Sequence, residues 1–267
     1  MSTSSLRHLT ARSLTAVALL SFTACGTVSE PLIPLVRNEP YEVRADFSDV
    51  RKTGAESAIR IRVLRDGKFA DLQKEFRVVH VAISHVSYGD MLHVVSPLNI
   101  GTGEYEVTHI FTQPGDYRIW VELENLTAAK QHGQYADLIA TGAFSVEGDA
   151  LPSSLMTGKT FTSGDYTLTL EQNALQFGTG STIRITVNDA LGKPYRLPPP
   201  EGTRYVLVGQ SLSFFNHGHI YTDPDGVTAS LPVTFPAPGV YGLWVEADPI
   251  TDTGYGSVAA PFLLTVR

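Results

Sequence analysis

The sequence has one cysteine among 267 residues, so it cannot form an internal disulfide, a cysteine-rich zinc site or an iron–sulfur cluster. Lysine and arginine are also few, 20 against 27 aspartates and glutamates, which argues against the basic surface that nucleic-acid binding needs. The sequence motifs of serine hydrolases, zinc proteases, nucleotide-binding loops and calcium loops are missing. We therefore expect no nucleic-acid partner and no enzymatic activity.

The first 24 residues have the pattern of a signal peptide. Two arginines precede an apolar run of nine residues at 14–22, which is shorter than the roughly 20 residues that a membrane-spanning helix needs. The segment ends in Phe22-Thr23-Ala24-Cys25-Gly26, which resembles the bacterial lipoprotein signal. This resemblance implies that Cys25 is lipidated and anchors the chain to a membrane, with residues 25–40 as a proline-bearing tether.

The resemblance also implies a location. Gly26 stands where an aspartate usually retains such lipoproteins at the inner membrane. We therefore expect a lipid-anchored, periplasm-facing protein of the bacterial cell envelope, with the outer membrane favoured. A plain signal peptide that happens to end near a cysteine is the alternative.

The rest of the chain contains an internal repeat. Residues 111–122 and 235–246 share the frame F-x-x-P-G-x-Y-x-φ-W-V-E at an offset of 124, and both tryptophans of the chain fall at the same place in it. A second match, residues 86–88 with 212–214, suggests an offset of 126. We interpret this as a duplication, with one domain at 41–148, a linker at 149–160 and a second domain at 161–267.

Each repeat has the sequence pattern of β-structure. Apolar and polar residues alternate with period two at 166–171 and 183–187, which puts one face of a strand in a core and the other outside it. Turn signals such as Asp66-Gly67 and Pro238-Gly239 separate these runs. The predicted fold class is all-β, with two tandem immunoglobulin-like antiparallel β-sandwich domains. In each repeat the tyrosine and tryptophan of the shared frame face opposite sides of a strand, so one of them is expected to meet solvent or the other domain.

Histidine is the residue type most informative about function. His217 and His219 lie two apart on a predicted strand, so both imidazoles point to one side and can share a metal ion. An offset of 126 aligns His219 with His93 and His217 with Met91. Imidazole and thioether ligands together suit copper, so copper is the expected ion. His85 precedes this segment and is a further candidate ligand.

Two other histidines are not expected to bind a metal ion. His80 lies on the opposite face of its predicted strand from Val79 and Val81, and that face is expected to meet water. His109 is expected to be a hydrogen-bonded histidine at the edge of the core.

The second repeat, from Gly164 through His217-Gly218-His219 to the Pro238-Gly239 turn, resembles the YtkA-like and related periplasmic immunoglobulin-like domains. These domains often occur in bacterial lipoproteins near copper or heavy-metal efflux systems, so the resemblance implies metal handling. The family often carries a further histidine before the apolar strand; Arg204 occupies that place here, and Val78 or Val79 occupies it in the first repeat.

Two functions remain open. The first is a non-enzymatic, lipid-anchored protein that binds or buffers a metal ion, with copper favoured. The alternative is a structural or interaction lipoprotein that binds an envelope protein or polymer without metal. A carbohydrate-binding form of the alternative needs solvent-facing aromatic side chains such as Tyr88, Phe214 or Phe215.

Overall fold

The computed structural model describes residues 41–47, 51–75, 77–125, 136–152, 158–199, 203–209, 212–251 and 254–267. The elements of this part of the chain are β-strands, and it holds no helix of the length and hydropathy needed to cross a membrane. The predicted signal peptide, Cys25 and the tether lie outside the described residues, as does part of the predicted linker, 153–157.

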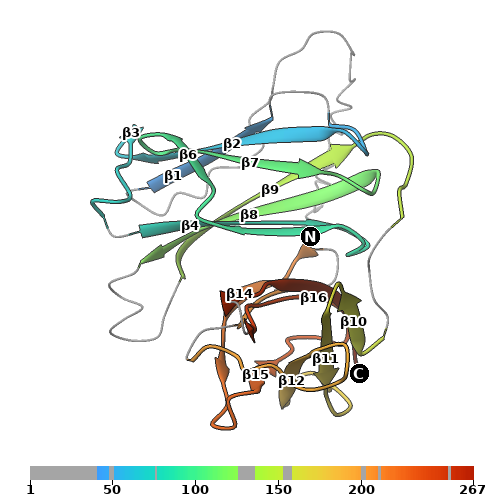
Figure 1. Ribbon diagram of the computed structural model, residues 1–267. Helices are drawn as coiled ribbons and strands as arrows, with labels where there is room; N and C mark the ends of the chain where they lie inside the picture. Colours follow the sequence, from blue (N-terminus) through green and yellow to red (C-terminus); the bar gives the residue numbers. More distant parts are fainter. Residues whose placement is uncertain are drawn as a thin grey trace, which may run out of the picture.

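The first domain consists of two antiparallel sheets packed face to face (Figure 1). One sheet has the order β1-β2-β7-β6, with β3 on β2, and the other has the order β5-β4-β8-β9. The strands are β1 (Tyr41–Phe47), β2 (Glu56–Arg65), β3 (Lys68–Phe69), β4 (Arg77–His85), β5 (Met91–Val95), β6 (Leu98–Gly101), β7 (Glu104–Ile110), β8 (Gly115–Asn125) and β9 (Ala136–Val146). The alternation in β2 buries Ile59, Ile61 and Val63 between the sheets.

The second domain has its own hydrophobic core, enclosed by one continuous sheet of eight strands that folds back on itself. The order is β10-β11-β12-β15-β14-β13-β16-β19, and β14 joins the two layers because it pairs with both β13 and β15. The strands are β10 (Thr160–Ser163), β11 (Tyr166–Glu171), β12 (Gly180–Asn188), β13 (Thr203–Val208), β14 (Phe215–Thr222), β15 (Thr228–Thr234), β16 (Gly239–Ala247) and β19 (Val258–Val266), with a small hairpin of β17 (Ile250–Thr251) and β18 (Gly254–Tyr255). The predicted all-β, immunoglobulin-like sandwich class is thus confirmed.

The strand order repeats between the domains, and so does the register. The order β5-β4-β8-β9 of the first domain returns as β14-β13-β16-β19 in the second. Ala82 pairs with His93, and Val206 pairs with His217 124 residues later. The hairpin turns agree, since His85 N–H donates to Asp90 O and Gly209 N–H donates to Phe214 O, again 124 apart. The offset of 126 predicted for this segment is therefore wrong, and a single offset relates the hairpins.

The shared P-G-x-Y segment has the same local structure in both domains. Tyr117 and Tyr241 are buried, and each hydroxyl oxygen lies close to the carbonyl oxygen four residues earlier, 2.7 Å from Gln113 O and 2.8 Å from Ala237 O. Trp120 points the opposite way and packs between the domains. One aromatic of the shared frame was expected to face either solvent or the other domain. Trp120 faces the other domain.

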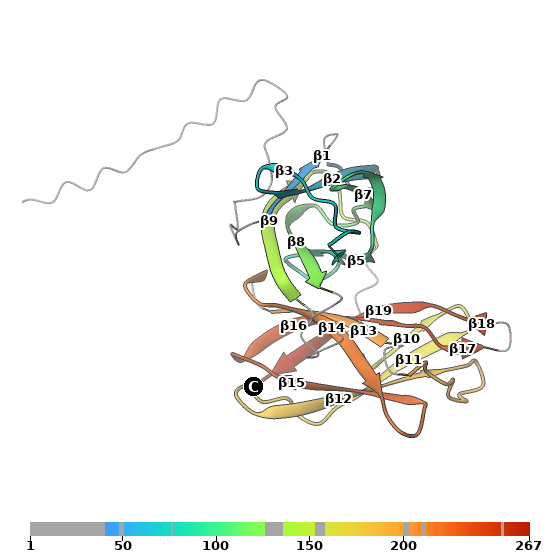
Figure 2. The same cartoon turned by 90° about the vertical axis from the view of Figure 1, so that its left-hand side faces the viewer.

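The two domains meet through equivalent sheets. Strands β13, β14 and β16 lie directly below the β4, β5 and β8 layer of the first domain (Figures 1 and 2). A separate apolar cluster fills the contact, formed by Ala82, Tyr88, Met91, Trp120, Val206, Val208 and Leu212. Trp120 stacks on Phe215 with ring centroids 4.8 Å apart. Strands β4 and β13 are therefore covered on both faces, once by their own core and once by the other domain.

Candidate metal centre between the two domains

Strand β4 places His80 at the interface. Val79 and Val81 point into the core of the first domain, so period-two alternation turns His80 toward the second domain. Its residue exposure is 3%. The expectation that this face meets water is wrong, because a second sandwich covers it.

Three imidazoles converge at this point. His80 on β4 and His93 on β5 come from the first domain, and His217 on β14 comes from the second. One ring nitrogen of each lies within 4.8 Å of the corresponding nitrogens of the other two. The ring centroids are 4.7 Å apart for His80 and His217, 4.6 Å for His93 and His217, and 5.8 Å for His80 and His93. This is the only such group of ligating side chains within the residues that the structure describes.

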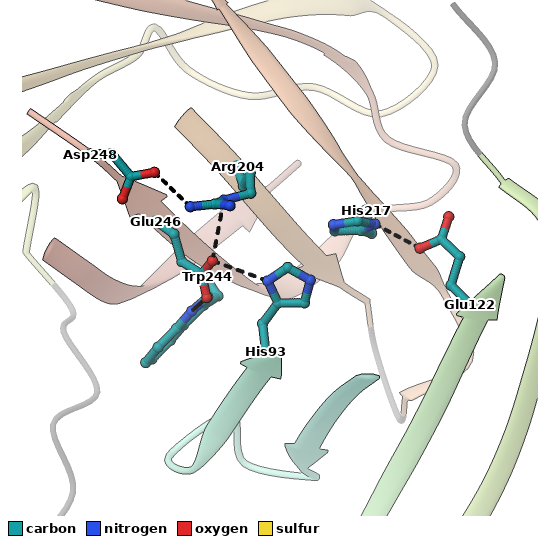
Figure 3. Close-up of polar contacts among 7 residues, drawn as sticks. All are labelled: His93, Glu122, Arg204, His217, Trp244, Glu246 and Asp248. Atoms are coloured by element: carbon teal, nitrogen blue, oxygen red, sulfur yellow. Dashed lines mark hydrogen bonds and ion pairs between the residues drawn. The ribbon is translucent and has the colours of Figure 1, made fainter. Parts of the chain in front are cut away.

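Each imidazole uses one nitrogen to hold a carboxylate. His217 Nδ1 is 2.6 Å from Glu122 Oε2, and His93 Nδ1 is 3.1 Å from Glu246 Oε2; both contacts cross from one domain to the other (Figure 3). His80 Nε2 is 2.7 Å from Glu124 Oε2 within the first domain. A carboxylate can only accept, so the ring nitrogen must carry the hydrogen in each pair.

The other ring nitrogens have no hydrogen-bond partner in the described part of the chain. They are His80 Nδ1, His93 Nε2 and His217 Nε2, and all three are buried. A buried nitrogen without a partner is costly, because it has lost water and gained nothing in return. With the opposite nitrogen protonated, each of these atoms offers a lone pair, which is what a metal ion requires of an imidazole.

The site follows the pseudo-twofold relation between the domains. With the offset of 124, His93 corresponds to His217 and Glu122 corresponds to Glu246. Each histidine of this set therefore pairs with the glutamate of the other repeat.

The third histidine breaks this symmetry. The residue equivalent to His80 is Arg204, whose Nη2 lies 2.6 Å from Asp248, the counterpart of Glu124. Arg204 Nε also lies 3.6 Å from Glu246. The first-repeat residue that corresponds to Arg204 is therefore His80, and not Val78 or Val79 as the sequence alignment indicated.

Two of the carboxylates at the cluster, those of Glu124 and Glu246, have a pKa below the ordinary value. Burial alone would raise the pKa of Glu124, but the hydrogen bond and charge of His80 and the charges of His219 and His217 bring it below its ordinary value. Burial likewise opposes ionisation of Glu246, while His93, the Trp244 indole N–H at 3.0 Å and Arg204 lower its pKa overall. Glu124 and Glu246 thus place negative charge beside the imidazoles.

The predicted ligands divide into two groups. His93 and His217 lie in the cluster. His219 shares the face of β14 with His217 and is close enough to influence Glu124, but it is not one of the three converging imidazoles. Met91 packs in the apolar interdomain cluster. His85 bonds Ser87 Oγ at 2.7 Å and Pro114 O at 3.1 Å, and it is not one of the three either.

Of the aromatic residues named for a carbohydrate-binding surface, one is buried and two are partly buried. Tyr88 is buried in the interdomain cluster, Phe214 packs against the core of the second domain, and Phe215 stacks on Trp120. The carbohydrate-binding form of the alternative therefore loses the residues on which it depended.

No family model and no curated protein sequence matches this chain. Among solved structures it is similar to the Escherichia coli adhesin FdeC, with 18% identity, a TM-score of 0.27 and coverage of 84% of this chain and 64% of that one. A putative membrane anchored protein from Corynebacterium diphtheriae has 11% identity and a TM-score of 0.27, over 83% of this chain and 58% of that one. The chain thus spans less than two thirds of both structures, and at these TM-scores neither bears on function.

Proposed function

We propose that the chain is a non-enzymatic, lipid-anchored protein of the bacterial cell envelope that holds a transition-metal ion between its two sandwich domains. The observation that carries this proposal is the convergence of three buried imidazoles, His80, His93 and His217, each with one unpartnered nitrogen. Three protein nitrogens plus one further ligand are a common set for zinc and copper. The ion would be carried or buffered, and the envelope location is inferred from the lipoprotein signal ending at Cys25.

The ligand set of this proposal differs from the one expected from sequence. The expectation of copper came from pairing Met91 with His93, and Met91 lies in the apolar cluster. His80 takes its place, so the donors are three imidazoles. An ion bound by all three at about 2.1 Å would bring their nitrogens to about 3.4 Å from one another, which requires side-chain shifts of roughly 1 Å.

A second candidate function has a specific observation in its favour. The apolar cluster and the two cross-domain histidine–glutamate pairs already hold the domains together without an ion. The protein would then be an interaction lipoprotein with a rigid two-domain body, and its partner would be an envelope protein or polymer.

Metal titration of two matched variants separates these functions. The full chain is titrated with Zn(II), Cu(II) and Cu(I) against a competing chelator. His217→Gln retains an amide donor for Glu122 but removes the ligand, so it should abolish stoichiometric binding. His219→Gln removes an imidazole from the same strand and should leave binding intact. Equal affinity in wild type and His217→Gln would contradict the metal proposal and favour the interaction lipoprotein.

The anchor is tested separately. Cys25→Ser should release the protein from the membrane fraction into the soluble envelope fraction, since one thioether-linked lipid anchor is lost. A variant that stays in the membrane fraction would contradict lipid anchoring without bearing on metal binding.

A further inference from the structure

Three glutamates orient the three imidazoles. Glu122 and Glu246 accept from Nδ1 of His217 and His93, which leaves Nε2 of each as the lone-pair nitrogen. Glu124 accepts from Nε2 of His80, which leaves Nδ1. The nitrogens left in this way are the ones that lack a hydrogen-bond partner. Hydrogen bonding thus selects the tautomer of all three rings.

We infer that Glu122, Glu124 and Glu246 are positioning residues that make the site selective for a divalent ion, Zn(II) or Cu(II), over monovalent Cu(I). This inference rests on the proposed function, because it concerns the ion that the same site takes. It departs from the sequence expectation of a methionine-containing copper site.

Charge is the first argument. Glu122, Glu124 and Glu246 each bond a different histidine of the cluster, and Arg204 pairs with both Glu246 and Asp248, so five charged side chains form a group around the site. With neutral imidazoles this group carries a net charge of −3, from four carboxylates and one guanidinium. At a given distance a dication gains twice the Coulomb energy of a monocation in this field.

The donor set is the second argument. Cu(I) prefers soft thiolate and thioether sulfur, whereas imidazole suits Zn(II) and Cu(II). The three converging side chains supply nitrogen only. The thioether of Met91 is part of the apolar cluster with Ala82 and Trp120, and its register places it two residues before His93 along β5. Chemistry and charge therefore favour the same class of ion.

Glu122→Gln tests the role of charge and tautomer together. The amide oxygen can still accept from His217 Nδ1, but the amide N–H₂ can instead donate to that nitrogen and leave the hydrogen on Nε2. Loss of such an outer-shell partner typically costs 10–100-fold in metal affinity. Glu171→Gln is the matched control, since Glu171 is exposed on β11 and remote from the cluster.

The two ions respond differently if charge matters. Removing one negative charge should lower the binding affinity for both ions. The loss of binding free energy should be twice as large for Zn(II) as for Cu(I), so a 100-fold loss of Zn(II) affinity goes with about a 10-fold loss of Cu(I) affinity. General damage to the site would weaken both by the same factor. The inference is overturned if Glu122→Gln loses the same factor of affinity for both ions, or loses none. It is also overturned if the wild type binds Cu(I) more tightly than Zn(II) and Cu(II). Metal binding itself would stand in each of these cases. A wild type that binds none of the three ions overturns the proposed function as well.

Nitrogen NMR of histidine-labelled, zinc-loaded protein tests the positioning directly. We expect the ring hydrogen on Nδ1 of His93 and His217 and on Nε2 of His80. The opposite tautomer at any of the three rings would show that the glutamates do not select it.

Discussion

His217 of the second domain lies 2.6 Å from Glu122 of the first. The equivalent residues of the opposite repeats, His93 of the first domain and Glu246 of the second, make the same contact. The repeats therefore exchange partners across their boundary. The three converging imidazoles also come from both sides of that boundary. The proposed ion site is therefore part of the contact between the domains.

Zinc should stabilise both domains together. Unfolding either domain removes a ligand, so each transition must release the ion. At free zinc 100 times the dissociation constant, the expected gain is about 2.7 kcal/mol in unfolding free energy. In scanning calorimetry, zinc should raise the unfolding temperature of both domains. In His217→Gln, zinc should leave both unfolding temperatures unchanged. A rise in the unfolding temperature of only one domain would contradict an ion shared by both.

Arg204→His should strengthen ion binding, because it restores the imidazole that symmetry places opposite His80. Arg204 lies on β13 where His80 lies on β4. The substitution adds a fourth nitrogen and removes a positive charge. Arg204→Gln removes the charge alone and serves as the control. Zinc affinity should rise at least about tenfold more in the histidine variant. Equal affinities in the two variants would show that position 204 does not reach the ion.

Gly242→Ala should destabilise the interface. A Cβ at this position would lie 2.8 Å from Cδ1 and 2.9 Å from Cγ of Tyr88, whose ring covers the glycine. Overpacking of this kind costs about 1–3 kcal/mol, measurable by urea unfolding. In a Tyr88→Gly background, which also removes the Tyr88 Cβ that lies 3.0 Å away, the added methyl group has room, so its cost should largely disappear. Additive costs in the double variant would mean that the ring and the glycine are not in contact.

Asp90→Asn should destabilise the first domain at neutral pH and lose its effect in acid. Asp90 accepts hydrogen bonds from His109 at 2.9 Å, from Thr112 N–H at 2.6 Å and from Tyr117 at 2.8 Å. Burial would raise the pKa of Asp90, but these bonds and the charge of His109 lower it overall. Asp90 therefore adds stability above about pH 4, which is the pKa of an aspartate in the unfolded chain. This stability is lost as pH falls through the lower pKa of Asp90 in the folded protein.

The expected cost of Asp90→Asn is about 2 kcal/mol at pH 7, the size of hydrogen bonds to a charged group, and it should shrink toward zero near pH 2. Urea unfolding at several pH values measures it. Asp66→Asn, in an exposed turn, should be neutral throughout. A pH-independent difference for Asp90 would show that its charge is not what stabilises the domain.

The fold was largely predictable from sequence because period-two alternation and turn residues are local signals. Ile59, Ile61 and Val63 alternate with arginines, and the structure buries those three side chains. The exchange of partners between domains leaves no such local signal. His80 lies in an apolar strand whose second face was expected to meet water, and only the contact between sheets shows that it is buried.

The register error had a larger effect on the candidate site. An offset of 126 aligned His93 with His219, whereas the strand pairing aligns it with His217. The conserved spacing of the two P-G-x-Y segments was the available signal. Applied along the whole repeat, their offset of 124 also relates Glu122 to Glu246 and would have identified the paired histidines and glutamates from sequence.

X-ray absorption at the zinc edge of the loaded full chain shows directly which atoms bind the ion. We expect three imidazole nitrogens at about 2.0–2.1 Å from the zinc and no sulfur, with loss of this spectrum in His217→Gln and its retention in His219→Gln. A sulfur neighbour at about 2.3 Å, or a spectrum unchanged in His217→Gln, would contradict an ion held by His80, His93 and His217.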